Sequence, residues 1–259
     1  TKPNKNEPEI NMTPINRRNR QENQIRKVTF ISNYTKHAQG SVLASFGDTK
    51  VICTATVTEG VPRFLRDSQP KQGWLTAEYS MLPSATNTRN NREAARGKVS
   101  GRTQEIQRLI GRSLRSCLNL RLISYLTINI DCDVIQADGG TRTTAISGAY
   151  VALVQAMQHL QYEKIITTDP IISQIAAVSV GVVGGIPMLD LDYNEDSAAD
   201  TDMNVVMNDK NQYIEIQGTA EKKPFSQKTL SEMLNLAKYG AEIIFHEQHK
   251  AINQKQNAL

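Results

Sequence analysis

The chain has 259 residues, enough for one large domain or two small ones with a substantial buried core. With 39% hydrophobic residues, 22% charged residues and a net charge of only +4, the average composition indicates no particular partner. The three cysteines are an odd number without CxxC spacing, which excludes a disulfide framework and a zinc site and predicts reduced thiols in a cytoplasmic protein.

The first part of the chain predicts a polar extension followed by strands and loops. Residues 1–14 lack the apolar core of a signal peptide and are expected to form a mobile extension beside a domain that spans residues 15–259. The run KVTFISNY predicts a strand. The run SVLASFGDTKVICTATV predicts a hairpin, because two β-prone segments flank Gly47-Asp48-Thr49. Prolines and glycines in residues 59–88 predict long irregular loops there.

Two helices and a strand are predicted next. Residues 103–120 carry apolar side chains at intervals of three and four, with arginines on another stripe, which is typical of an amphipathic helix. The run LTINIDCDVI alternates as a strand does. The run ISGAYVALVQAMQHL is apolar on most sides and predicts a largely buried helix.

The last part predicts strands and a closing helix. The strand candidates are IAAVSVGVV, IPMLDLD, MNVVMN and QYIEIQGTA. The longest uncharged run, residues 170–189, contains a Gly-Gly turn and several polar residues, so it predicts two buried strands and excludes a membrane span. A capping box, Thr229-x-x-Glu232, is expected to open the last helix. This order predicts an α+β fold, a single compact domain with mixed sheets and packed helices.

The segment GGTRT at residues 139–143 stands between the predicted strand 126–135 and a predicted helix. This position brings backbone N–H groups, hydroxyls and a guanidinium to a helix N-terminus, where free donors and the helix dipole favour an anion. A phosphate fits that chemistry. The segment is not a Walker loop, because GxxxxGK[ST] occurs nowhere in the chain. The alternative is a glycine turn with a capping threonine.

Acidic residues cluster near the end of the third quarter of the chain, where residues 190–209 hold seven acids and no base. In a strand, Asp190 and Asp192 would share a face, and an acid from the following turn could join them. Clustered carboxylates suit a magnesium or manganese ion. The alternative is a loop whose acids are simply exposed to solvent.

A basic segment precedes these features, with eight arginines and one lysine between Arg89 and Arg121. Arginines without interleaved aromatic residues favour contacts with backbone phosphates over base stacking. The alternative is that they pair with acids at a subunit interface. Together, an anion cradle, a hard-metal site and a cationic surface indicate phosphoryl chemistry on a nucleic acid.

Long motifs in consistent order closely resemble the ribonuclease PH family of phosphate-dependent exoribonucleases, from about Arg17 to the last helix. The motifs are GSVLASFGDTKVICTATV, EGVP, GWLTAEYSMLP, REAARGK, SGRTQEIQRLIGRSLR, DCDVIQADGGTRT, LDLDYNEDSAADTDMNVVM and EIQGTAE. The chain is similar, less closely, to the cores of polynucleotide phosphorylase and the exosome ring.

The resemblance implies specific roles for residues. The arginine of SGRT and the GTR triplet imply phosphate binding by Arg102, Gly140, Thr141 and Arg142. The family's pair of aspartates six residues apart is matched with Asp190 and Asp196, as catalytic and metal-binding residues, with Asp202 as a further metal-supporting acid. Arg89 and Arg92 are implied in RNA contact. Relatives usually carry arginine after MLP, where this chain has Ser84.

The resemblance also implies an activity and an assembly. The expected reaction removes nucleotides from RNA 3′ ends, above all those of tRNA precursors, with inorganic phosphate as co-substrate, Mg²⁺ or Mn²⁺ as cofactor and nucleoside diphosphates as products. Nucleotide addition is its reverse. The expected assembly is a homohexameric ring, a trimer of dimers. The alternatives are a non-catalytic RNA-binding ring subunit and a metal nuclease that uses water.

Overall fold

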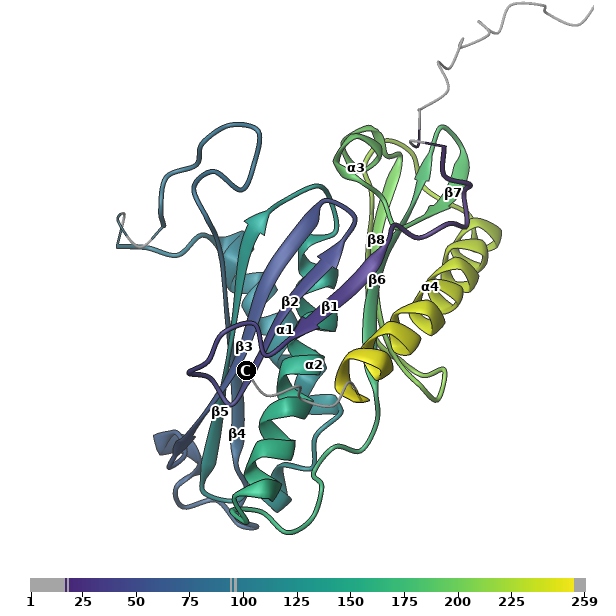
Figure 1. Ribbon diagram of the computed structural model, residues 1–259. Helices are drawn as coiled ribbons and strands as arrows, with labels where there is room; N and C mark the ends of the chain where they lie inside the picture. The colour runs from purple at the N-terminus through teal and green to yellow at the C-terminus, as the bar shows by residue number, and fades with distance from the viewer. Residues whose placement is uncertain (1–16, 18, 94, 96, 254–259) are drawn as a thin grey trace, which may run out of the picture.

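The computed structural model describes residues 17, 19–93, 95 and 97–253; the expected extension at residues 1–14 lies outside them. Four α-helices and nine strands follow one another along the chain (Figure 1). The strands are β1 (Val28–Ser32), β2 (Gly40–Phe46), β3 (Thr49–Glu59), β4 (Trp74–Met81), β5 (Leu126–Gln136), β6 (Ile175–Val183), β7 (Ile186–Leu189), β8 (Thr201–Asn208) and β9 (Tyr213–Ala220). The helices are α1 (Gly101–Ser116), α2 (Thr141–Tyr162), α3 (Tyr193–Ala198) and α4 (Gln227–Asn253).

The first sheet has the strand order β1-β2-β3-β5-β4. The predicted hairpin is confirmed, because β2 and β3 pair antiparallel on either side of the turn at Gly47-Asp48. The prediction that residues 59–88 are irregular throughout is wrong, since β4 pairs in parallel with β5. Its side chains alternate between buried and exposed, with Leu75, Ala77 and Tyr79 buried. The alternation typical of a strand was therefore present in the sequence between Pro70 and Pro83.

The second sheet is antiparallel, with the order β7-β6-β8-β9. One of its two inner strands, β6, is buried at every position, which agrees with its continuous apolar sequence. The predicted strand IPMLDLD ends at Leu189, so residues 190–192 are not strand. Asp190 has a positive φ of 53°, and Asp192 is the N-cap of α3. The two aspartates therefore do not share a strand face as expected.

Helix α2 lies between the two sheets, in contact with β2 and β3 on one side and with β6 on the other (Figure 1). This placement explains why it is apolar almost all round. Close approach to the first sheet requires Gly148, because a Cβ there would lie 2.6 Å from the Cβ of Ala44. The N-terminus of α2 is thereby held at one end of both sheets.

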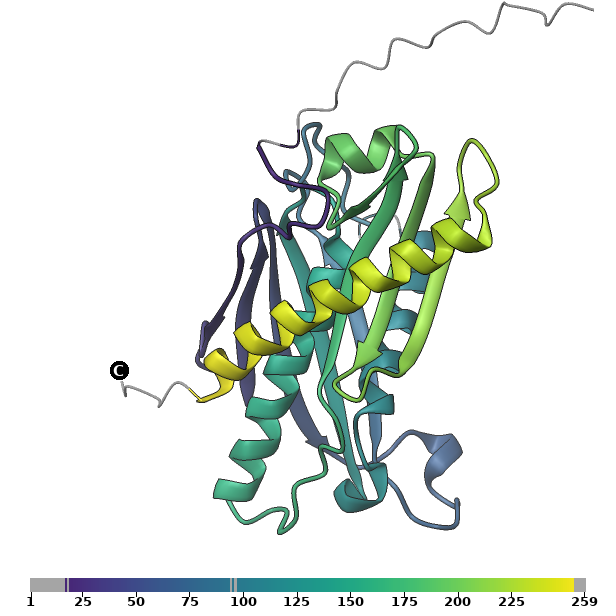
Figure 2. The ribbon, with the colours of Figure 1, turned by 90° about the vertical axis from the view of Figure 1, so that its right-hand side faces the viewer.

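Helix α4 crosses the outer face of the second sheet and contacts β6, β7 and β1 (Figure 2). It begins earlier than the predicted capping box, because the Ser226 hydroxyl accepts a hydrogen bond from the Thr229 N–H, 3.1 Å away. Among the described residues, no helix has the length and apolarity needed to cross a membrane. The predicted α+β class is confirmed as two sheets with packed helices.

Candidate active site

The GGTRT segment forms the N-terminus of α2, as predicted. Gly139 and Gly140 have φ values of 75° and 64°, a left-handed conformation that favours glycine. Gly140 is the N-cap, and its carbonyl accepts hydrogen bonds from the hydroxyls of Thr143 and Thr144, each at 2.9 Å. Since a glycine N-cap offers no side chain, the first amides of this long helix stay available to an anion.

A hollow of about 310 Å³, here called the anion pocket, lies at this helix end. It is lined by Met81, Thr86, Asn90, Arg102, Ala137, Gly139, Gly140, Thr141, Arg142, Ser179, Tyr193, Asp196, Asp202 and Asn204. All four predicted phosphate-binding residues and two of the three predicted acids therefore surround one cavity. They come from α1, α2, α3 and β8, so the fold collects them from distant parts of the chain.

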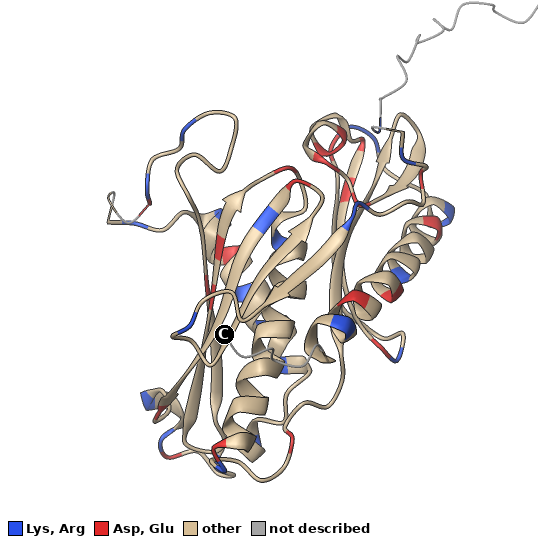
Figure 3. Cartoon of the chain, in the orientation of Figure 1, with Lys and Arg blue, Asp and Glu red and all other residues tan. Residues whose placement is uncertain are grey.

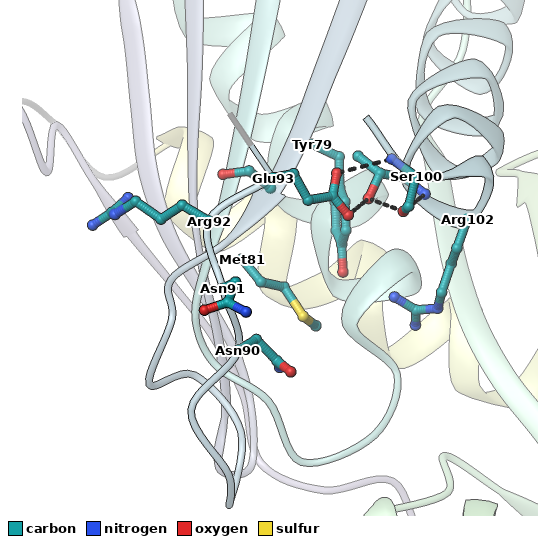
Figure 4. Close-up of a pocket in the computed structure, with 10 residues that line it drawn as sticks. Tyr79, Met81, Asn90, Asn91, Arg92, Glu93, Ser100 and Arg102 are labelled. Carbon is teal, nitrogen blue, oxygen red and sulfur yellow. Dashed lines mark hydrogen bonds between the residues drawn. The ribbon is translucent and has the colours of Figure 1, made fainter. Parts of the chain in front are cut away.

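Arg102 enters the pocket from the first turn of α1. The Ser100 hydroxyl caps that helix by accepting a hydrogen bond from the Thr103 N–H at 3.2 Å, and Glu93 accepts one from the Thr103 hydroxyl at 2.9 Å. A second hollow of about 340 Å³ adjoins the anion pocket and also contains Arg102 (Figure 4). In that view the Arg102 side chain extends toward Met81 and Asn90.

Arg142 is oriented by two residues outside the helix. Its Nη1 lies 3.5 Å from Oε1 of Glu105 and 3.3 Å from Oε1 of Gln217, while the Gln217 amide donates to Glu105 at 3.0 Å. Thr141, which precedes Arg142, is held by the buried Tyr79 hydroxyl, which donates a hydrogen bond to the Thr141 hydroxyl at 2.8 Å. Burial raises the pKa of Tyr79. Thr141 and Arg142 are therefore held in place by side chains from α1, β4 and β9.

Asp196 and Asp202 form the acidic side of the pocket. Desolvation raises the pKa of Asp196, against the opposing effects of Arg142 and Arg102. Desolvation, and then the charge of Asp196, raise the pKa of Asp202 to about 6. Two carboxylates that are mutually repelled and face two guanidiniums favour a bound cation on their side and a bound anion between the two sides.

The expectation that Asp190 and Asp196 come together at one site is not met, because Asp196 lines the anion pocket and Asp190 does not. Its side chain is fully buried outside the anion pocket and accepts hydrogen bonds from Arg26, at 2.9 Å from Nε and 2.7 Å from Nη2. Asp196 and Asp202 are also six residues apart, so the spacing alone fitted two pairs. The positive φ of Asp190 turns its side chain toward Arg26.

The anion pocket brings together two of the three acids predicted to hold a metal ion, Asp196 and Asp202. Among the described residues, no group of three or more His, Cys, Asp or Glu side chains is arranged to hold a metal ion. The pair that remains, Asp196 and Asp202, still suits Mg²⁺, which commonly takes one or two carboxylates together with substrate phosphates and water. The pKa of each acid is raised, so the positive charges of the pocket do not fully offset the cost of burying the two carboxylates.

The arginine-rich segment does not form a continuous stripe (Figure 3). Arg112 pairs with Glu215 at 2.5 Å, and Arg115 lies 4.6 Å from the centroid of the Trp74 ring. Arg96 lies outside the described residues. At least two of these arginines therefore serve contacts within the chain, and Arg102 is the one arginine of the described part of this segment that lines the anion pocket.

Arg89 and Arg92 are exposed on the long loop between β4 and α1. Arg92 lines the hollow that adjoins the anion pocket, but its side chain points away from Arg102 (Figure 4). Arg89 does not line the anion pocket, and its Nη1 lies 3.5 Å from Oδ1 of Asn91. Of the two predicted RNA contacts, Arg92 therefore shares a hollow with Arg102, while Arg89 lines neither hollow.

The sequence analysis missed seven residues that line the anion pocket, of which three belong to the second sheet and α3; the seven are Met81, Thr86, Asn90, Ala137, Ser179, Tyr193 and Asn204. Asn204 follows Asp202 by two positions in β8, so strand alternation places both on one face. Ser179 lies in the continuous apolar strand β6, where its hydroxyl was the only polar signal. Tyr193 follows directly after the N-cap of α3 and is half exposed. Of these three, only Asn204 could have been found from a pattern.

Two family models match the chain. The model described as 3′ exoribonuclease family, domain 1, matches residues 24–157, and that of domain 2 of the same family matches residues 173–240. The first range covers the first sheet, α1 and most of α2; the second covers the second sheet and the first half of α4. The anion pocket draws residues from both ranges.

Solved structures share the fold. The crystal structure of rice (Oryza sativa) Rrp46 is 18% identical with a TM-score of 0.73, over 91% of this chain and 99% of that chain. A structure titled as the Archaeoglobus fulgidus exosome with RNA bound to the active site is 20% identical with a TM-score of 0.75, over 88% and 90%. An archaeal exosome core is 19% identical with a TM-score of 0.69, over 89% of each chain.

Proposed function

The chain belongs to the 3′ exoribonuclease family, and on that premise we propose that it is a catalytic member, a phosphorolytic 3′-to-5′ exoribonuclease. The observation that carries this proposal is the union of Arg102, Arg142 and the first amides of α2 with Asp196 and Asp202 around one cavity. An oxygen of inorganic phosphate attacks the last phosphodiester of an RNA. The bond from phosphorus to the 3′ oxygen of the preceding nucleotide breaks, which releases a nucleoside diphosphate and leaves a new 3′ hydroxyl.

The main obstacle to this reaction is electrostatic, because a phosphate dianion must approach an anionic phosphodiester. Two like unit charges about 4 Å apart in an effective dielectric near 20 repel each other by roughly 4 kcal/mol. The two charges of the phosphate dianion therefore repel the single charge of the phosphodiester by roughly 8 kcal/mol. Arg102 and Arg142 would neutralise the attacking phosphate, and the Gly140 and Thr141 amides would orient it. The nucleophile comes from phosphate, so no nucleophilic side chain is needed.

Asp196 and Asp202 would hold Mg²⁺ or Mn²⁺ in this proposal. When bound, the ion supplies charge stabilisation at the scissile phosphate and the leaving oxygen. The raised pKa values of the two carboxylates support this assignment, since a cation relieves their mutual repulsion. Asn204, which lies on the same face of β8 as Asp202, adds a neutral polar group beside them.

The RNA substrate and the assembly are part of the same proposal. We assign tRNA 3′ ends as the substrate from the resemblance of the chain to ribonuclease PH. We assign the ring, a trimer of dimers, from the same resemblance; two of the similar structures are exosomes. Exposed Arg89 and Arg92 would then contact the RNA backbone away from the cleaved bond.

The second candidate is a non-catalytic ring subunit. The similarity to Rrp46 at 18% identity shows the fold alone and does not separate the two candidates, while the set of arginines and acids in the anion pocket favours catalysis. An assay of products from a 3′-labelled RNA separates the candidates. Nucleoside diphosphates formed only with phosphate support phosphorolysis. Monophosphates formed without phosphate indicate hydrolysis by water, and intact RNA under both conditions indicates a non-catalytic subunit.

A further inference from the structure

Arg26 is buried between two loops of the candidate site, although it lies outside the anion pocket. One loop, residues 138–140, leads into α2 and its first amides; the other, residues 190–192, leads into α3 and Asp196. We infer that Arg26 is a positioning residue, which holds the phosphate-binding amides at a fixed distance from the acid on α3. This inference rests on the proposed function.

Arg26 makes several hydrogen bonds to the loop of residues 190–192. The Asp190 carboxylate accepts three hydrogen bonds from Arg26, from the backbone N–H at 2.8 Å, from Nε at 2.9 Å and from Nη2 at 2.7 Å. The Asp190 N–H in turn donates to the Ser179 carbonyl at 2.7 Å. A bidentate pair with an additional backbone bond fixes both the position and the direction of the guanidinium.

The same guanidinium also contacts the loop of residues 138–140, which leads into the phosphate-binding amides. Nη1 donates to the Asp138 carbonyl, and Nη2 lies 3.4 Å from the Gly139 carbonyl. The Thr49 hydroxyl also donates to the Gly139 carbonyl, at 2.6 Å. Because the guanidinium of Arg26 is planar and rigid, it cannot keep its hydrogen bonds to both loops if one loop moves relative to the other.

The two loops also touch directly. A Cβ at Gly139 would lie 2.5 Å from the Leu191 carbonyl oxygen, so the chain approaches closer there than any side chain permits. Burying an ion pair costs desolvation energy that its attraction often only offsets, so its use lies more in fixing geometry than in stability. Here the fixed geometry is that of the phosphate-binding amides relative to Asp196.

The test compares Arg26→Lys and Arg26→Gln with the wild-type protein. A lysine can keep one bond to Asp190 but cannot bridge both loops. We expect the phosphate KM to rise about ten-fold or more in Arg26→Gln, and by less in Arg26→Lys, because misplaced anion-binding groups lose orientation. A second readout needs no turnover: the rise in Tm at a fixed phosphate concentration should shrink most in Arg26→Gln and less in Arg26→Lys, because weaker binding stabilises the folded state less.

A matched control is Gln248→Met. Gln248 is fully buried in α4 and donates to the carbonyls of Ser147 and Ile175, at 2.9 and 3.0 Å, without contacting the anion pocket. We expect this variant to lose stability while it keeps the wild-type phosphate KM. Unchanged phosphate dependence in both Arg26 variants, or an equal change in Gln248→Met, would overturn the inference. A wild-type protein that neither binds phosphate nor releases diphosphates would instead overturn the proposed function.

Discussion

Nη1 of Arg142 lies 3.5 Å from Oε1 of Glu105, so a carboxylate shares the guanidinium that faces the anion pocket. Glu105 is partly exposed, and such pairs contribute only about 0.2–1 kcal/mol to stability. Its negative charge, however, opposes an incoming phosphate dianion. The structure thus places a charge that orients Arg142 but weakens the attraction of the pocket for its ligand.

Replacing Glu105 with glutamine should therefore strengthen phosphate binding. The amide oxygen can still accept from Gln217, which bonds to Glu105 at 3.0 Å, so the local arrangement persists. We expect the phosphate KM to fall about 2- to 5-fold, with kcat nearly unchanged, the size expected for one partly solvated charge. Steady-state kinetics over a range of phosphate concentrations measure this; a higher KM would show that Glu105 serves mainly to orient Arg142.

Arg102→Ala and Arg142→Ala are expected to reduce phosphate-dependent trimming strongly. Each variant loses a charge-assisted contact of about 1.5–3 kcal/mol, which corresponds to about 10- to 100-fold in kcat/KM for phosphate. Arg102 is exposed and Arg142 only partly buried, so Tm should change little. The measurement is diphosphate release together with circular dichroism melting. Near-normal turnover in either variant contradicts the assignment of these arginines.

Asp196→Asn and Asp190→Asn should separate a metal-binding acid from a structural one. We expect Asp196→Asn to raise the magnesium concentration needed for half-maximal activity while its Tm stays near that of the wild type. Asp190→Asn leaves Arg26 buried without its hydrogen-bonded counter-charge, which costs about 3–5 kcal/mol and should lower Tm by on the order of 10 °C. A magnesium titration and a melting curve for each variant test this. An altered magnesium requirement in both variants would restore the original pair of Asp190 and Asp196.

The phosphate side of the site could be predicted from the sequence because its signal is local. Gly139 and Gly140 precede a run of apolar residues, and a strand-to-helix turn is the conformation that two adjacent glycines with positive φ permit. The hairpin at Gly47-Asp48 is local in the same sense. In each case a few consecutive residues determine the geometry.

The acidic side could not be fully predicted because its geometry depends on distant partners. Asp190 is turned away from the pocket by Arg26, which is 164 positions earlier in the chain. Its neighbour Asp192 caps α3 through hydrogen bonds from the Asn194 and Glu195 N–H groups, both at 3.0 Å. Spacing shows which acids could face one another, and only the fold decides which of them do.

The desolvation of Asp202 predicts a conflict between stability and function. Desolvation and the charge of Asp196 raise its pKa to about 6, from about 3.9 in an unfolded chain. Between these values the folded state binds more protons, so this group makes the protein less stable as pH rises from about 4 to 6, and the loss persists above pH 6. In a chelator at pH 7.5, Asp202→Asn should therefore melt a few degrees above the wild type, and the difference should shrink at pH 5 and on adding Mg²⁺. The exposed Asp209→Asn is the control, and a lower Tm for Asp202→Asn at both pH values would contradict the prediction.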